Sequence, residues 1–497
     1  MKTWRILSSA GILGFMAVTA ALPVNAQERI REVSLDQCIQ QAIRDNLNLR
    51  EYHLGLRYND LSITQAESSF DPSLSLSATR NESETPNFFE YYNVNAIQQE
   101  NTDFNVTFGQ DLVTGATWGV GLYTTLSSSN IETTKNYTSN LGIQIDQPLL
   151  RGFGSRVNTS NIYIARINSE RSMYNLEQQA NNLVSEVTRA FWNLVYARQT
   201  LAVHEISIEQ ADSLLAYNRK GFELGVMTES DVLEAQSALA SRRQEALNQQ
   251  NTIDLYEDQL RRLLNITSQE DWDIRIVPTD LPRISTIDTN PEHALELAFS
   301  GRPDYRLMQK DTEQYEISTM VAKNALLPNL NLSARYRLNS SGETIGENYR
   351  ELGDTDAFGW TLGLVFNYPI GNRYAKTDYE KRQIDVKRSQ LRLEYLESQI
   401  RTDIRTAIRN LATAREQIDA AGLTVEVNEL KLKIEEERFR NHLSSSYYVL
   451  QFQRDLANSR NLYNRALIDY VLAAADYQLA RGTLLGDYGI SIITDDN

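Results

Sequence analysis

Two unusually long heptad patterns dominate this sequence. Apolar residues step by alternating four and three from Leu176 to Leu201, and again from Ile400 to Val425. A period of 3.5 residues sustained over this length predicts a coiled-coil seam. No proline or glycine interrupts residues 155–220, and at about 1.5 Å per residue a helix there would be on the order of 100 Å long. Since one globular domain cannot bury such a rod, we expect an assembly of rods.

The sequence also contains an internal repeat. Residues 42–80 match residues 298–336 at an offset of 256, which places Pro72 on Pro328, and a second register at an offset of 217 places Phe222 on Phe439. The first copy is therefore 39 residues longer between its two prolines, the difference between the offsets. We interpret this as an internal tandem repeat, far longer than the period of a solenoid.

Each copy is predicted to have the same order of helix, strands, very long helix and shorter helix. We expect a signal peptide over 1–26, a first repeat over 27–289, a second over 290–482 and a tail over 483–497. In the first repeat we expect strands within 73–147, a long helix at about 155–222 and a helix at about 229–264. In the second we expect strands within 330–368, a long helix at about 374–440 and a helix at about 447–482.

The first 26 residues look like a secretory signal. Lys2 and Arg5 precede a largely apolar run, and Val24-Asn25-Ala26 is an acceptable cleavage site. The alternative is an N-terminal membrane anchor. Removing the signal takes away two positive charges and no acid, so the formal net charge goes from −16 to −18. A surface this acidic repels nucleic acid, and we expect no nucleic-acid partner.

The remaining composition excludes several classes of site. Cys38 is the sole cysteine, so no intrachain disulfide forms, and its amphipathic surroundings predict a core position. The four histidines are scattered without metal-ligand spacing. No nucleophile elbow or Walker loop occurs. We therefore expect no enzyme activity, no metal and no cofactor. After residue 26, no run reaches the roughly 20 apolar residues of a transmembrane helix, so membrane entry would have to use strands.

Strand-like alternation fills the space between the helical patterns. Residues 73–79, 103–113, 117–127, 140–147, 330–336 and 358–368 alternate apolar and polar side chains. Long polar segments (81–102, 128–139, 339–357), which we expect to be loops, and one tight Thr114-Gly115 turn separate them. This arrangement is typical of an outer-membrane barrel, with a soluble β-sandwich as the alternative. One chain has too few strands to close a channel, so several chains must surround an axis.

Proline marks each crossing between strands and helices. Proline lacks a backbone donor and disfavours helix in the residue before it, and glycine then permits a sharp change of direction. The predicted barrel–helix joints are Pro72, Pro148, Gly152, Gly154, Pro328, Pro369 and Gly371.

Several motifs carry a resemblance to a known family. The stretches VSLDQCIQQAIRDNLNLR, FDPSLSLS, QPLLRGFG and FELGVMTESDVLEAQSAL, with the echo FRNHLSSSYYVLQFQRDL, occur in that order over the whole mature sequence. Together they resemble the TolC-like outer-membrane efflux proteins. The resemblance implies a mainly α fold with a β part, in which a homotrimer forms one outer-membrane β-barrel continued by a long periplasmic coiled-coil α-barrel.

The same resemblance implies a function in the outer membrane. It implies passive export of substrates that an inner-membrane pump of RND or ABC type delivers through a periplasmic adaptor, either in efflux or in type I secretion. The runner-up is a structural coiled-coil protein that spans the periplasm. In the duct interpretation the helical tips dock the adaptor. The first tip comprises Leu224, Gly225, Val226, Met227 and Thr228, and the second comprises His442, Leu443, Ser444 and Ser445.

The sequence departs from the family pattern in two places. The family has two strands per repeat, and the 39 extra residues supply either two more strands or a long external hairpin loop, which we favour because the helical tube fixes the circumference. At the entrance, Asp231 matches the family's acidic gate residue, but Phe439 and Ser444 stand where its partners would be. The usual acidic ring falls on Tyr448 and Gln451. Asp231 and Glu234 could form a ring instead, or could be ordinary helix-start acids.

Overall fold

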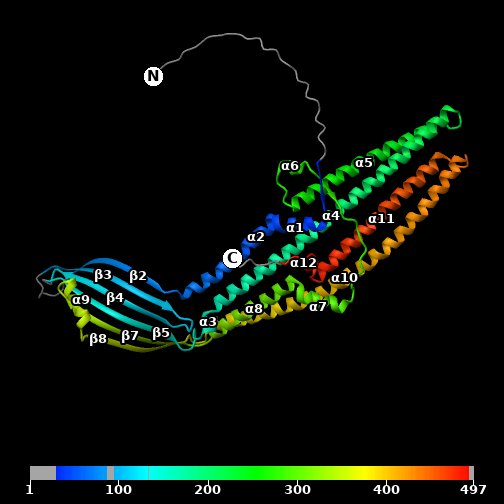
Figure 1. Ribbon diagram of the computed structural model, residues 1–497. Coiled ribbons are helices and arrows are strands. Elements are labelled where there is room, and N and C mark those ends of the chain that lie inside the picture. Colours follow the sequence, from blue (N-terminus) through cyan, green and yellow to red (C-terminus); the bar gives the residue numbers. More distant parts are fainter. Residues whose placement is uncertain (1–28, 87–93, 132–133, 492–497) are drawn as a thin grey trace, which may run out of the picture.

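The computed structural model describes residues 29–86, 94–131 and 134–491. The described chain is a long rod, with a β-sheet at one end and the tips of two helical hairpins at the other (Figure 1). The predicted signal peptide and the last six residues of the predicted tail lie outside these ranges. The prediction of a mainly helical chain with a β part is confirmed.

Helices form most of the rod. The longest pair are α4 and α10, and each is followed by a shorter antiparallel helix. Three of these four helices both begin and end within two residues of the predicted limits. The helices are α1 (Leu35–Asp45), α2 (Leu47–Glu67), α3 (Ser155–Asn158), α4 (Ser160–Glu223), α5 (Glu229–Leu263), α6 (Gln269–Trp272), α7 (Pro291–Gly301), α8 (Pro303–Asn324), α9 (Ile345–Asp354), α10 (Arg373–Arg440), α11 (Ser446–Ala480) and α12 (Leu484–Asp487). Helix α4 begins five residues after the predicted start of the first long helix, because the separate short helix α3 occupies the residues before it and ends at Asn158.

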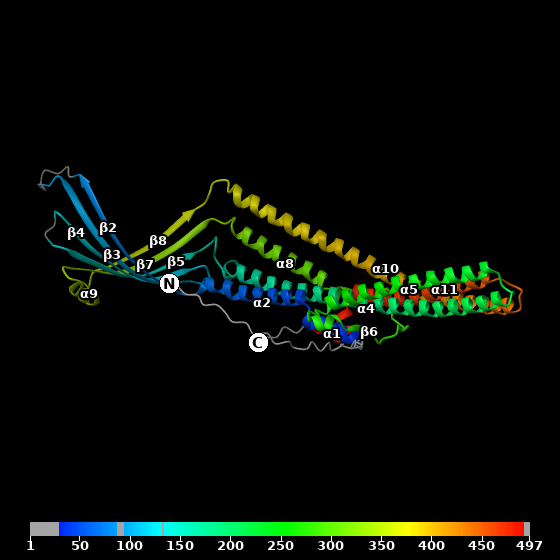
Figure 2. The same cartoon turned by 90° about the horizontal axis from the view of Figure 1, so that it is seen from above.

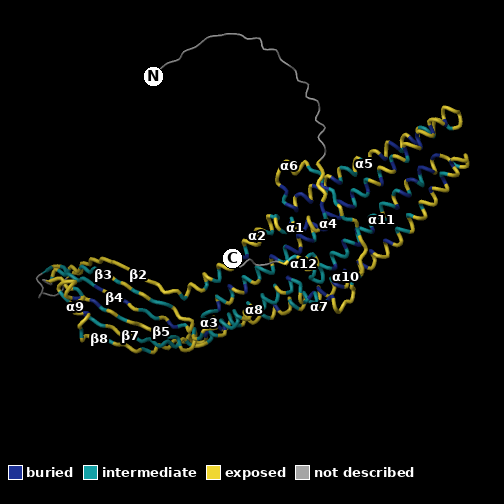
Figure 3. The backbone as a smooth tube through the Cα atoms, in the orientation of Figure 1, coloured by how far each residue is buried: buried dark blue, intermediate teal, exposed yellow. Residues whose placement is uncertain are grey.

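The heptad seams are the buried lines of these helices. Leu176, Val187 and Leu194 on α4 are almost fully buried, as are Ile400 and Ile404 on α10. Alanines at intervening seam positions let the neighbouring helices approach closely. The buried residues run as a line along the rods, while the opposite sides stay exposed (Figure 3). The seams thus stabilise each hairpin along its own length.

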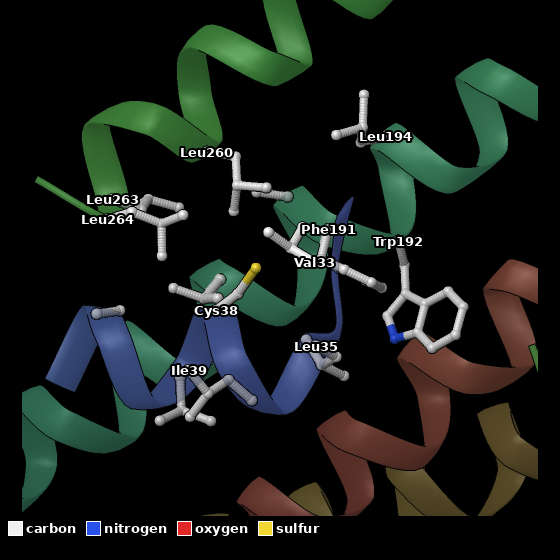
Figure 4. Close-up of a cluster of buried hydrophobic side chains, with 14 of the residues drawn as sticks. Val33, Leu35, Cys38, Ile39, Phe191, Trp192, Leu194, Leu260, Leu263 and Leu264 are labelled. Atoms are coloured by element: carbon white, nitrogen blue, oxygen red, sulfur yellow. The ribbon is translucent and has the colours of Figure 1, made fainter. Parts of the chain in front are cut away.

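A small region at the middle of the rod brings the two ends of the first repeat together. Strand β1 (Ile30–Val33) pairs in parallel with β6 (Arg275–Pro278), so the start of the first repeat joins the linker to the second. Cys38, Ile39 and Phe191 are buried in the apolar cluster that includes Ile276 of β6 and Val33 of β1, and Figure 4 shows them around Val33. The predicted core position of Cys38 is therefore observed. The pair itself was not predicted, because its two four-residue strands give no alternation to read.

The sheet contains six antiparallel strands. They are β2 (Ser73–Pro86), β3 (Ala96–Asp111), β4 (Thr117–Ser129), β5 (Asn136–Pro148), β7 (Asn329–Gly342) and β8 (Phe358–Asn367), in the order β2-β3-β4-β5-β7-β8. The favoured hairpin loop is wrong: the extra residues of the first copy form strands β3 and β4, paired along their full lengths with β2 and β5. Backbone pairing holds the Asn/Ser/Thr-rich ends of β2 and β3, which the alternation of side chains did not mark.

The two faces of the sheet differ in polarity. Residues directly opposite in antiparallel strands share a face, and the register places Leu76, Val106, Leu122, Leu141 and Leu338 in one such row. The apolar side chains of this face are mostly exposed, whereas the polar side chains between them on β3 are half-buried. This contrast indicates a convex apolar face and a concave polar one. Among the described residues, no helix is both long and apolar enough to cross a membrane.

A short helix interrupts a segment that was predicted as a polar loop. Helix α9 follows β7 and packs on the apolar face at the end of the sheet away from the long helices (Figure 1). Its fully buried Asn348 accepts from the Ser340 hydroxyl at 2.6 Å and donates to the Ser139 hydroxyl at 2.7 Å. Thr344 caps its first turn by accepting from the Glu347 backbone N–H. The prediction of a loop over 339–357 is therefore wrong for most of that segment.

Candidate functional site: the helical tips and the joints

The first tip is a tight helix-to-helix turn. Helix α4 ends at Glu223, and Gly225 then adopts a left-handed φ of 71°, a conformation that glycine takes without strain. The backbone N–H of Val226 donates to the Gly221 carbonyl at 2.9 Å, which closes the turn. Leu224 and Val226 are left 72% and 61% exposed. The turn thus presents two apolar side chains to solvent at the very end of the rod.

The next helix starts with a capping box. The backbone N–H of Thr228 donates to the Asp231 carboxylate at 3.0 Å, and the Asp231 backbone N–H donates back to the Thr228 hydroxyl. Asp231 therefore satisfies the backbone of its own helix start. Met227 is half-buried against the core of the tips. The structure thus gives Asp231 a capping role, which is one of the two roles that the sequence allowed.

The second tip repeats this turn with different residues. His442 occupies the position of Gly225 in the repeat and has a left-handed φ of 60°. Leu443 is 69% exposed and its counterpart Val226 is 61% exposed. The backbone N–H of Leu443 donates to the Arg438 carbonyl at 2.8 Å. Ser445 takes the N-cap position without a side-chain hydrogen bond, and α11 begins at Ser446. The two tips therefore expose equivalent apolar residues on equivalent turns.

A buried polar contact joins the two hairpins just above the tips. The side-chain amide of Asn218 on α4 donates to the Ser446 hydroxyl at 2.8 Å and to the Asp231 backbone carbonyl at 3.0 Å. Asn218 and Ser446 are both fully buried. One amide thus links the first tip, the second tip and the rod between them.

Two further contacts tie the hairpins together. The Arg242 guanidinium on α5 donates to the Gln453 side-chain oxygen on α11 at 3.1 Å and to the Ser207 carbonyl at 2.6 Å. Burial lowers the pKa of Arg242, an effect that Glu245 opposes and Arg454 reinforces. Phe439 lies in the apolar core of the tips and packs on Tyr217, with ring centroids 5.4 Å apart. Phe439 therefore supplies an apolar contact between hairpins where the family pattern implied a polar one.

The other predicted gate residues do not all lie at one site. Glu234 and Gln451 line one groove between α5 and α11, together with Tyr447. Tyr448 is exposed and packs edge-on against Tyr447. The Ser444 hydroxyl donates a short hydrogen bond to the Glu435 carboxylate, which also accepts from Arg438 at 3.0 Å. Within this chain, Glu234 and Gln451 therefore line the same groove, whereas Asp231 bonds to Thr228 at the start of its own helix.

The contacts that join the hairpins were not found from the sequence. Asn218 and Ser446 are 228 positions apart, and Asn218 lies outside the motifs that carry the family resemblance. One signal was available: the offset of 217 places Glu435 at the position of Asn218. An amide in one repeat and a carboxylate in the other, both buried, mark a place where the copies have different partners.

The first joint, around Gly152 and Gly154, is hydrogen-bonded to residues of both repeats. Gly152 and Gly154 have left-handed φ values of 81° and 102°, and the Gly152 N–H donates to the Asn324 side chain at the end of α8 at 2.7 Å. The Gly154 N–H donates to the Thr114 carbonyl in the β3–β4 turn at 3.1 Å. A side chain at Gly115 would collide with the Gly152 carbonyl. The extra hairpin of the first repeat therefore rests on the joint.

The second joint is simpler. Gly371 has a φ of 89° and Asn372 a φ of 42°. The Asn372 side chain donates to the Leu326 carbonyl at 3.2 Å, just before Pro328. Pro72 and Pro328 precede β2 and β7, Pro148 ends β5, and Pro369 follows β8. In the part of the chain that the structure describes, no cluster of three or more histidine, cysteine, aspartate or glutamate side chains is placed to hold a metal.

Comparisons with known proteins agree with this geometry. The family model described as "Outer membrane efflux protein" matches residues 38–265 and 294–485. The outer membrane efflux protein BepC of Brucella suis biovar 1 (strain 1330) is 23% identical over 355 residues, which cover 70% of this chain and 73% of BepC.

Solved structures share the fold. The CmeC outer membrane channel of Campylobacter jejuni superposes with a TM-score of 0.67 at 16% identity, over 90% of this chain and 86% of that one. The outer membrane protein VceC of Vibrio cholerae superposes with a TM-score of 0.67 at 15% identity, over 90% and 96%. The family match covers both repeats, the long hairpins and the joints, so this chain belongs to the outer membrane efflux protein family and is an outer-membrane component of an efflux pathway.

Proposed function

We propose that three copies of the chain close head to tail into one continuous duct across the outer membrane and the periplasm. The observation that carries this proposal is the pair of unpartnered edges of the single chain. The sheet leaves β2 and β8 as its edge strands. The helices beside it lie in the order α2-α4-α8-α10, with α2 and α10 at opposite margins (Figure 2).

Both marginal helices expose an apolar heptad stripe. On α2 the stripe is Leu47, Leu54, Tyr58 and Leu61, each 60–72% exposed. On α10, Ile384, Leu391 and Tyr395 repeat the steps of seven and four, and are 58–73% exposed. An apolar stripe at heptad spacing needs a partner helix. Two different stripes on opposite margins of one chain would form a heterologous interface, which gives a ring when the rotation between copies closes.

The widths of the two layers support six strands per chain. Four helices about 9–10 Å apart span roughly 40 Å. Six strands about 4.8 Å apart and tilted by about 40° span roughly 38 Å, whereas four strands would span only about 25 Å. The β3–β4 hairpin therefore widens the sheet to the arc of its own helices. Three copies would form a barrel of eighteen strands, with the apolar face toward lipid.

The tips would be the docking and gating end of this duct. The exposed apolar residues at both turns would bind a periplasmic adaptor, which connects the duct to an inner-membrane pump. Glu234 and Gln451 would line the entrance between α5 and α11, while Asp231 keeps its capping role. Asn218–Ser446 and Arg242–Gln453 would hold the hairpins in the closed packing. Because a coiled coil has discrete packings, breaking a few such contacts would bias the entrance toward opening.

The experiment that tests this function is assembly in outer membranes. The wild-type protein should need detergent for extraction, migrate as a trimer on unheated gels and form channels in planar bilayers. Leu54→Glu and Leu391→Glu should each abolish the trimer, because each buries a charge in an apolar stripe, whereas Leu281→Glu in the exposed linker should not. A wild-type protein that is soluble without detergent would support the structural coiled-coil alternative instead.

A further inference from the structure

Two arginines stand side by side on the concave polar face of the sheet. Arg335 and Arg337 lie at the middle of β7, two residues apart, and therefore on the same face. The register places Arg335 opposite Gln144 on β5 and opposite Thr361 on β8. It places Arg337 opposite Gly142 and Gly359 on the same two strands.

Glycines let the Arg337 side chain lie flat on the sheet. A Cβ atom added at Gly359 would lie 3.1 Å from the Arg337 Nε and 3.4 Å from its Cγ, so the side chain crosses the space that a larger residue would fill. At Gly142 the added atom would lie 3.6 Å from the Arg337 Cβ. Tyr123 covers Gly121 in the same way, with its ring 2.6 Å from the added atom. The long side chains of this face thus lie along the wall.

Neither guanidinium has an anionic partner among the described residues. Arg80, near the far end of the sheet, pairs with Glu100, but the structure assigns no ion pair or side-chain hydrogen bond to Arg335 or Arg337. Asp103, on the same polar face, accepts from the Thr125 hydroxyl at 2.6 Å. The nearest acids on this face are Asp146 and Asp111, which lie in the next row along, in register with Ser333 and Thr117.

Both arginines also line a groove. The groove runs across β3, β4, β5 and β7 and includes Tyr123, Asn140 and Gln144. Its walls therefore combine two unpaired guanidinium groups with amide and phenol hydrogen-bonding groups. A guanidinium binds carboxylate, phosphate and sulfate oxygens through two parallel N–H donors. The groove is suited to small anions.

We propose that Arg335 and Arg337 form an anion-attracting band on the inner wall of the exit duct, through which solutes bearing carboxylate, phosphate or sulfate groups pass in preference to cations. This proposal rests on the trimeric duct proposed above. In a trimer, two arginines per chain give six guanidinium groups in two adjacent rows of the wall. Rings of arginine or lysine confer anion preference on pores. The formal net charge of the chain is −16, so this band would be a locally positive region in a negatively charged protein.

The test is selectivity and block in planar bilayers. Under a KCl gradient, replacing both residues (Arg335→Gln with Arg337→Gln) should lower the chloride-to-potassium permeability ratio by at least about threefold, because local wall charge sets local ion concentration. Citrate added on the side of the sheet should reduce wild-type current at low salt and leave the double variant unblocked. Replacing both with lysine should keep the anion preference. Arg350→Gln on the exposed surface of α9 is the matched control and should change neither property.

The outcomes separate this proposal from the duct itself. Channels whose reversal potential and citrate block are the same in the wild type and the double glutamine variant would overturn the arginine band and leave the duct intact. An absence of channels in the wild type would overturn the duct. If the double variant does not insert, the single variants decide: each should show an intermediate shift, and two unshifted single variants would contradict the proposal.

Discussion

The side-chain amide of Asn218 in the first hairpin donates a 2.8 Å hydrogen bond to the hydroxyl of Ser446 in the second, and both side chains are fully buried. This contact has no counterpart in the other half of the repeat, where Glu435 takes the position of Asn218 and bonds within its own tip. The hydrogen bond between the tips therefore occurs once per chain and is not repeated by the equivalent residues of the second hairpin. It joins the first hairpin to the second at the end that would admit substrate.

Asn218→Ala and Ser446→Ala should each increase the open probability of the channel. Each replacement leaves a buried polar group unpaired and removes a bond that holds the hairpins together. The double variant should open no more than the stronger single variant, because both act on one contact. Single-channel recording measures this. Thr424→Ala, which removes an exposed hydroxyl bonded only within α10, should have no effect, and strictly additive effects of the two replacements would argue against a shared contact.

Val226→Asp and Leu443→Asp should abolish capture of the cognate periplasmic adaptor while the trimer persists. Both side chains are exposed at the tips, so a charge there costs the fold little but disrupts an apolar docking surface. Co-purification of the adaptor with the extracted protein measures the effect. Leu281→Asp, which places the same charge on an exposed linker residue, is the control. Full adaptor binding by both tip variants would exclude the tips as the docking site.

Glu257→Gln should destabilise the middle of the rod by about 3–5 kcal/mol, the usual effect of removing one partner of a buried ion pair. The Glu257 carboxylate is almost fully buried and accepts from Arg198 and Arg261, each at 2.7 Å. The neutral amide would remove the carboxylate that pairs with Arg198 and would leave Arg261 paired only with the exposed Asp258. Thermal unfolding followed by circular dichroism measures the loss. Glu316→Gln at an exposed position of α8 is the control and should leave the midpoint of thermal unfolding unchanged. An unchanged midpoint for Glu257→Gln would show that this buried ion pair does not stabilise the protein.

The Cys38 thiol should resist alkylation in the native protein. Burial raises its pKa to about 12, an effect that Arg31 opposes and Asp280 reinforces. The thiolate is the reactive form, so the rate of labelling by iodoacetamide should stay low between pH 7 and pH 9 and rise only on unfolding. Since the folded pKa lies above the unfolded value, the free energy of unfolding should also fall above about pH 9. Rapid labelling of the native protein at pH 8 would contradict this burial.

The sequence predicted the long rods well because the heptad pattern is local and repeated in both copies. Seam residues such as Val187 and Ile404 are buried where the period of 3.5 residues placed them. The joints were also predictable, because Gly152 and Gly154 require backbone conformations that few residues adopt. In these elements, local chemistry and tertiary packing favour the same structure.

The features that were missed depend on partners that are distant in sequence. The polar ends of β2 and β3 are strands because each pairs with a neighbour, and their side chains carry no alternation. The β1–β6 pair joins residues about 245 positions apart, and Asn218–Ser446 joins the two repeats. The prediction of a loop in place of β3 and β4 was wrong because it assumed that the four helices of one chain are as wide as four strands. Their width matches six tilted strands.

The most direct test of the account is a cryo-electron microscopy reconstruction of the full protein extracted from outer membranes. We predict three chains around one axis, with β2 of each chain paired with β8 of the next and a continuous barrel of eighteen strands above the helical tube. Arg335 and Arg337 should face its interior. A reconstruction in which the sheet edges stay unpaired, or in which β3 and β4 lie outside the barrel, would contradict the account.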